Sequence, residues 1–190
     1  MKRKFTKAIL AAAITAMPLA ASEYAFDTHS LFAIEGGASS VDIDVTGPTD
    51  ATVEDSAVAN VGIKLGAQSE NYRVFLSARY YDVQDIESLY TVGGEIQYLF
   101  NFSKYANFFI GGNIGEAFIQ IKEDSGSAKS MYYGGDVGFN IHASKTFDIE
   151  LGGRYMQLSE TVTPVGSAYS YDFNYIATGY ASLIIKWQMD

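Results

Sequence analysis

The strongest constraint on the fold is a two-residue alternation of apolar and polar side chains that recurs along the chain. In one segment, for example, Ile63 and Leu65 alternate with Lys64 and Gly66. Successive side chains of a strand point to opposite faces, so the pattern predicts an all-β protein whose strands each have one apolar face. Eight such segments are found, at 31–40, 59–68, 72–81, 90–100, 107–118, 133–142, 147–155 and 174–187.

The connections between these segments alternate in length. Those at 69–71, 101–104 and 143–145 are short, whereas those at 41–56, 82–88, 120–130 and 158–170 are longer. Outer-membrane barrels have short turns on the periplasmic side and long loops outside. We therefore predict an eight-stranded antiparallel up-and-down transmembrane β-barrel, with both termini periplasmic.

A water-soluble barrel or sandwich is the rival fold, since it also has short alternating strands. In those folds the apolar face points inward and the polar face meets water. Here the polar faces carry Gly, Ser, Asn and Thr with isolated charges of both signs, and few long Lys or Glu side chains. Such residues suit a narrow packed lumen, which favours the membrane barrel.

Aromatic residues gather near the ends of the predicted strands, with Val, Ile, Leu, Ala and Gly between them. Outer-membrane barrels carry such aromatic girdles at both membrane interfaces. The predicted girdle residues are Tyr72, Tyr80, Tyr90, Tyr98, Phe100, Tyr105, Phe118, Tyr133, Phe147, Tyr155, Tyr175 and Trp187.

The first residues are typical of a secretory signal peptide. A basic head that ends at Lys7 precedes an apolar run, 8–19, and then the small residues Ala20, Ala21 and Ser22. The apolar run is shorter than the ~20 residues that a membrane-spanning helix needs. We predict a cleaved segment 1–22 and a barrel domain 23–190.

Charge and composition exclude several kinds of function. The chain has 13 basic and 22 acidic residues, and loss of a signal peptide with four basic residues leaves a net charge of −13. Nucleic-acid binding needs a basic surface, so we predict no nucleic-acid partner. With no Cys and two His, most transition-metal and thiol chemistry is also excluded, and we predict no cofactor and no metal site.

Paired glycines recur in five of the predicted strands, as in Gly93-Gly94 and Gly134-Gly135. An eight-stranded barrel is only wide enough inside for side chains, and glycine leaves room for long residues from across the lumen. The strand phrases at 108–113 and 132–138 resemble the small outer-membrane β-barrel family, which includes the OmpA transmembrane domain and the OmpX and Ail proteins. The resemblance covers 23–190 and implies outer-membrane lipid and the barrel-assembly machinery as partners. That machinery would read the C-terminal strand, although Trp187 stands three residues before the end instead of at it.

Eleven charged residues are predicted to face the lumen. Six are acidic and five basic, which is near the balance that a buried network requires. They are Glu35, Lys64, Arg73, Arg79, Glu95, Glu116, Asp136, Asp148, Glu150, Arg154 and Lys186. We expect the three arginines to pair chiefly with Glu95, Asp136 and Glu150. Glu116 is placed inward on the expectation of a β-bulge near Gly115.

Three functions remain open at this stage. The favoured one is a structural or adhesive role, carried by acidic outer loops at 41–56 and 158–170, which would contact a host or neighbouring-cell surface. A narrow channel for ions or small solutes is the alternative, and a lipid-modifying enzyme is the third. Both histidines, His29 and His142, are predicted at the periplasmic end, away from a lipase-type site at the outer rim. Divalent cations could also bind the clustered loop carboxylates.

Overall fold

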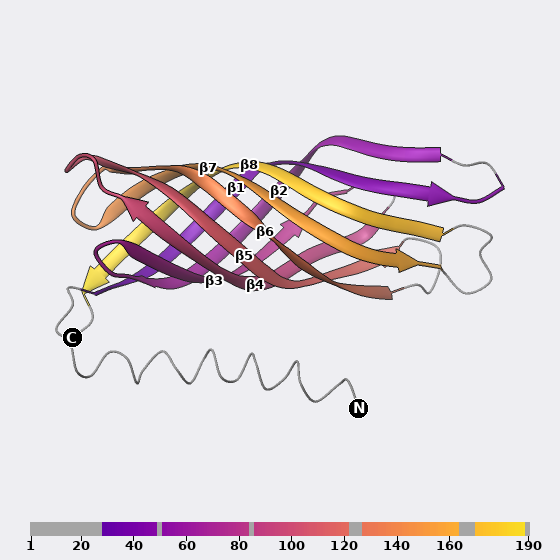
Figure 1. The fold of residues 1–190 in the computed structure, drawn as a ribbon, viewed down its shortest axis with the longest axis horizontal. Coiled ribbons are helices and arrows are strands. Elements are labelled where there is room, and N and C mark those ends of the chain that lie inside the picture. The colour runs from indigo at the N-terminus through magenta and orange to yellow at the C-terminus, as the bar shows by residue number, and fades with distance from the viewer. Residues whose placement is uncertain (1–27, 49–50, 84–85, 122–126, 164–169, 189–190) are drawn as a thin grey trace, which may run out of the picture.

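The computed structural model describes residues 28–48, 51–83, 86–121, 127–163 and 170–188, and the predicted signal peptide lies outside this part. The described residues form eight strands in one closed antiparallel barrel, in which β1 pairs with both β2 and β8 (Figure 1). The strands are β1 (His29–Thr46), β2 (Ala51–Gln68), β3 (Tyr72–Tyr81), β4 (Ile86–Phe100), β5 (Ala106–Ile121), β6 (Ser127–His142), β7 (Phe147–Val162) and β8 (Ser170–Gln188). The predicted fold class is confirmed. No helix in these ranges could cross a bilayer.

At one end of the barrel β1 begins, β8 ends and the short turns lie. His29 at the start of β1 is the register partner of Gln188 at the end of β8. The turns 69–71, 101–105 and 143–146 lie at this same end, and β1–β2 and β7–β8 project furthest at the opposite end (Figure 1). We call these the turn end and the hairpin end.

The lipid-facing surface is formed by one side chain in two along each strand. The six residues predicted to face lipid all point outward: Ile63, Leu65, Ile96, Val137, Leu151 and Leu183. Their exposed fractions lie between 46% and 57%, and a belt of large apolar side chains this exposed is unusual in a protein that faces water. The outward apolar face is what a membrane barrel requires.

The strands extend further at the hairpin end than predicted. Part of the chain that was expected to form loops there is therefore strand. β1 continues to Thr46 and β2 starts at Ala51, which turns most of the predicted loop 41–56 into strand. Similarly, β7 extends to Val162 and covers the first five residues of 158–170, and β8 starts at Ser170. At ~3.3 Å per residue and a tilt of ~40°, an 18-residue strand spans ~45 Å along the barrel axis, against an apolar band of ~25 Å. These hairpins therefore project beyond the membrane as sheet.

Alternation continues in the projecting part, but the polarity of the two faces is reversed. In β1, Val41 and Ile43 are buried inside the barrel, while Asp42 and Asp44 point outward. Water replaces lipid around this part, so polar side chains now belong outside and apolar ones inside. The reversal is the physical reason why the segment reads as a loop in the sequence.

Glycines on the inner face make room for large side chains from other strands. A Cβ on Gly93 would lie 2.1 Å from the Tyr132 hydroxyl, and a Cβ on Gly115 would lie 2.5 Å from it. Likewise, a Cβ on Gly152 would lie 2.7 Å from the Tyr180 ring. The glycines thus seat rings that fill the bore.

The predicted bulge near Gly115 is absent, since β5 keeps an unbroken register with β4 around this residue and with β6 throughout. One bulge that does occur lies in β2, where the pairing with β1 shifts between Ser39 and Val41. Ala57 in this bulge has a φ of 73°, a left-handed conformation that glycine adopts more easily. Another bulge, in β8, turns Asn174 outward, although the sequence pattern places it on the inner face.

Candidate functional site

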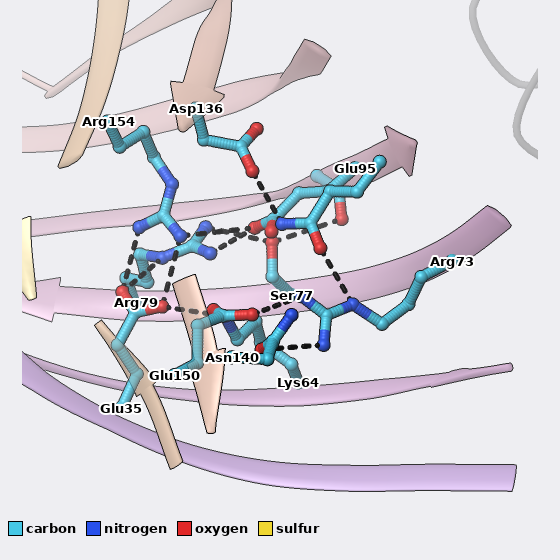
Figure 2. Close-up of polar contacts among 12 residues, drawn as sticks. Glu35, Lys64, Arg73, Ser77, Arg79, Glu95, Asp136, Asn140, Glu150 and Arg154 are labelled. Atoms are coloured by element: carbon cyan, nitrogen blue, oxygen red, sulfur yellow. Dashed lines mark hydrogen bonds and ion pairs between the residues drawn. The ribbon is translucent and has the colours of Figure 1, made fainter. Parts of the chain in front are cut away.

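The middle of the lumen is filled by buried ion pairs centred on Glu35 (Figure 2). The Glu35 carboxylate lies 3.1 Å from Nζ of Lys64 and accepts a hydrogen bond from Nε of Arg79 at 2.9 Å. Arg154 binds both of its oxygens, at 2.7 and 3.0 Å. All four side chains are at most 1% exposed. One carboxylate from β1 therefore joins three cations from β2, β3 and β7.

Two further carboxylates complete the network. Glu150 accepts a hydrogen bond from Lys64 at 2.7 Å and another from Arg73. Glu95 accepts a hydrogen bond from Arg79, and Nη2 of Arg154 lies 3.7 Å from it. Because Lys64 and Arg79 each contact two carboxylates, the pairs form one continuous cluster. A buried charge that is unpaired is strongly unfavourable, and this cluster avoids that state.

Asp136 differs from the prediction that it pairs with an arginine. It accepts a hydrogen bond from the Gln97 amide and makes no ion pair with another described residue. Arg154 is its register partner on β7, yet the guanidinium extends across the lumen to Glu35. With Glu35 the forked guanidinium forms a bidentate pair, one hydrogen bond to each carboxylate oxygen.

A chain of amides links the network to the turn end. Arg73 donates to Asn140 at 3.1 Å, and Asn140 donates to Asn107 at 2.7 Å. Beyond them, Asp148 lies 2.9 Å from Nδ1 of His142 and 2.7 Å from Nζ of Lys186. His142 thus stands at the barrel mouth among structural partners.

An apolar layer closes the lumen at the hairpin end, and each of its fully buried members is at most 7% exposed. Ser39, Asn60 and Thr178 form a hydrogen-bonded polar cluster next to this layer, on the side towards the turn end. The polar part of the lumen ends at this cluster. The buried residues of this layer, which we call the plug, are Val41, Ile43, Val58, Tyr81, Val83, Leu89, Ala117, Ile119, Tyr132, Met156, Leu158, Phe173 and Ile176.

Together, the ion-pair network and the plug fill the lumen with the protein's own side chains. The inward charges of the described residues balance, with five carboxylates against five cations. They are Glu35, Glu95, Asp136, Asp148 and Glu150, against Lys64, Arg73, Arg79, Arg154 and Lys186. No group of three His, Cys, Asp or Glu in the described ranges is placed to hold a metal ion.

Known structures with the same architecture are found by comparison of the fold. Neisserial surface protein A aligns with a TM-score of 0.58 at 15% identity, over 82% of this chain and 97% of that one. The outer membrane protein OprG of Pseudomonas aeruginosa gives 0.56 at 12%, over 84% and 97%. The N-terminal β-barrel domain of OprF from the same species gives 0.54 at 9%, over 85% and 98%.

The chain has the fold of the small outer-membrane β-barrels. No protein-family model matches the sequence, and a comparison with curated proteins finds no match either. At these low identities the likeness shows the fold and does not extend to the residues of the site.

Ten of the eleven charged residues predicted to face the lumen point inward, and Glu116 does not. Its register partners, Val92 on β4 and Met131 on β6, both face outward. The missing bulge near Gly115 explains the difference, because an unbroken strand keeps Glu116 on the outer face. Glu116 lies near the hairpin end of β5.

The predicted girdle residues lie on the outer face, and several contact one another. Towards the turn end, Tyr98 packs edge-on against both Tyr72 and Phe100, with ring centroids 5.1 and 4.7 Å apart. Towards the hairpin end, Tyr155 stacks with Tyr175 at 5.4 Å. The belts hold the barrel at both interfaces, where amphipathic rings are favoured.

The plug and the amide chain are the parts of the lumen that the sequence pattern missed. Apolar residues on the inner face look like lipid-facing ones, which hides the plug. A change of phase could have revealed it, because Val41 and Ile43 alternate out of step with Phe32 and Ile34 in the same strand.

Proposed function

We propose that this protein is a non-conducting outer-membrane barrel that acts through its projecting hairpins. One observation carries the proposal: the plug seals the hairpin end above a lumen that salt bridges already fill. An ion would have to separate buried pairs and then cross an apolar layer, and both steps are unfavourable. The geometry therefore gives no support to the alternative of a channel.

The projecting hairpins supply a surface for a partner. Asp42 and Asp44 point outward from β1, and Nδ2 of Asn174 on β8 donates to both, at 2.7 and 2.9 Å. Asp172 is the register partner of Asp44, so the carboxylates share one side of the sheet. Charge complementarity favours a basic partner surface. The turn end, where β1 begins and β8 ends, would face the periplasm, and the exposed Trp187 on β8 would serve barrel assembly.

Catalysis has little support among the described residues. His142 and Asp148 form a pair with acid–base character. Its other contacts are already made, because Asp148 also pairs with Lys186 and the second ring nitrogen of His142 lies beside the Asn107 amide. A nucleophile-type site needs a hydroxyl within reach of the base. The described hydrogen-bond partners of His142 are Asn107 and Asp148, and neither provides a hydroxyl.

The test is adhesion of proteoliposomes that carry the protein to a cell monolayer. We expect the wild type to adhere and the adhesion to fall as salt rises, because exposed charges are screened. A double variant, Asp42→Asn with Asp44→Asn, should weaken adhesion and leave the barrel folded. A matched control is Glu70→Gln in a turn at the other end. Equal adhesion of the double variant and the control would contradict the proposal.

A further inference from the structure

A hollow in the outer surface interrupts the apolar belt between β2 and β4. It is an open depression with a volume of about 400 Å³. The small side chain of Ala78 lies between Ile63 and Val92, which are its register partners on the neighbouring strands. Tyr80 and Tyr90 stand opposite each other at the edge nearer the hairpin end. The walls are apolar, so the hollow suits a hydrocarbon chain.

A row of rings leads from this hollow to a cation. Tyr90 pairs in register with Phe118 on β5, and Phe118 pairs with Lys129 on β6. The Tyr90 and Phe118 rings are stacked, with centroids 4.9 Å apart. Nζ of Lys129 lies 4.8 Å from the centroid of the Phe118 ring. Lys129 is exposed and makes no ion pair with another described residue.

The depth of Lys129 matches a lipid headgroup. It lies 13 residues from His142, which ends β6 at the turn end. At ~3.3 Å per residue and ~40° of tilt this is ~33 Å along the axis, just beyond the ~25 Å apolar band. The hollow lies within the belt, so one molecule could occupy both.

We propose that this face binds one phosphate-bearing membrane lipid, with an acyl chain in the hollow and the phosphate at Lys129. Within the apolar belt, an acyl chain that fits against Ala78 gains close van der Waals contact with the wall of the hollow. The ammonium supplies charge-assisted hydrogen bonds to phosphate oxygens. Glu116 lies two residues deeper than Phe118 on the same outer face of β5. The proposal goes beyond surface adhesion and does not depend on it.

The experiment is native mass spectrometry of the folded, delipidated barrel titrated with phosphatidylglycerol. We expect one tightly bound lipid per barrel. Ala78→Leu fills the hollow and should weaken binding by about tenfold, which corresponds to ~1.4 kcal/mol. Lys129→Ala should weaken it to a similar degree, whereas Glu116→Gln should leave it unchanged or tighter. These side chains all point outward, so heat-modifiable gel mobility should report folded barrels in each case.

A second outward hollow provides the matched control. It measures about 320 Å³ and is lined by Tyr72, Ile96, Tyr98, Ile110 and Gly112. Gly112→Val fills it and should leave the tight site at wild-type affinity. Equal loss from Gly112→Val, no loss from Ala78→Leu or Lys129→Ala, or equally tight binding of inorganic phosphate alone would each overturn the proposal.

Discussion

Within the apolar belt the barrel turns apolar side chains to the lipid and buries its charges, whereas beyond the belt the same strands bury apolar side chains and turn polar ones outward. β1 passes through both regions: Ile34 points out and Glu35 in, then Val41 points in and Asp42 out. Strands β4 to β8 reverse likewise, with Ser88, Gln120, Lys129, Gln157 and Asp172 on the outer face of the projecting part.

The contrast shows that the surroundings, lipid or water, decide which face of a strand is apolar. The backbone alternation is the same in both regions. In the membrane part the lumen is stabilised by ion pairs, and in the projecting part by packing like that of a water-soluble protein. The two regions should therefore respond differently to substitution.

The largest effect is expected where the membrane part is most dependent on charge. Glu35→Gln leaves Lys64, Arg79 and Arg154 without their shared carboxylate, and removal of one partner from a buried pair costs about 3–5 kcal/mol. We expect the free energy of unfolding to fall by that amount in urea titrations in lipid vesicles. Glu116→Gln, on the outer face, is the control and should change it by less than ~1 kcal/mol. Similar losses in the two variants would show that the network contributes no special stability.

The plug should respond as a packed core does. Leu89 is fully buried, and Leu→Ala substitutions in cores destabilise by about 2–5 kcal/mol. Val92→Ala on the lipid face of the same strand is the control and should cost clearly less. Urea unfolding of the two variants compares them directly. A Leu89→Ala loss no larger than that of Val92→Ala would mean that the hairpin end is not tightly packed.

A glycine that seats a ring should tolerate no methyl group. In Gly152→Ala the new Cβ would meet the Tyr180 ring at 2.7 Å, and overpacking of this kind costs about 1–3 kcal/mol. Tyr180→Leu should relieve part of that loss, so a double-mutant cycle on unfolding free energies should show positive coupling. Additive effects of the two substitutions would contradict the seating of the ring.

The smallest effect concerns the bulge in β2 beside the start of the projecting part. Ala57 has a positive φ, so Ala57→Gly should stabilise the barrel by about 0.5–1 kcal/mol. Ala59→Gly, in regular strand two residues on, should destabilise by a similar amount because glycine loses more conformational freedom. Opposite signs in thermal unfolding are the expected result, and a loss in both variants would argue against the left-handed conformation.

The membrane part of the barrel was predictable from the sequence because lipid and lumen impose opposite polarities on the two faces. That contrast identified the strands, the outward residues such as Ile96 and Leu183, and the inward charges such as Lys64 and Arg154. The partners of those charges were less predictable. Arg154 reaches past its register neighbour Asp136 to Glu35, and such a crossing depends on three-dimensional geometry.

The projecting part was not predictable by the same rule. Its polar outer face and short connections resemble loops in sequence, and its inner Val and Ile residues resemble lipid-facing ones. Glu116 was misplaced for a related reason. Ala117 and Ile119 belong to the plug, so apolar residues on both faces of β5 removed the alternation that would have fixed its phase.

Single-channel recording in a planar bilayer tests the closed lumen most directly. The wild-type barrel, inserted in either orientation and held at voltages of both signs, should show no steady open level, because an ion would have to cross the apolar plug and separate buried ion pairs. A stable, sustained conductance from the wild-type protein would contradict this and would make the lumen a working pore.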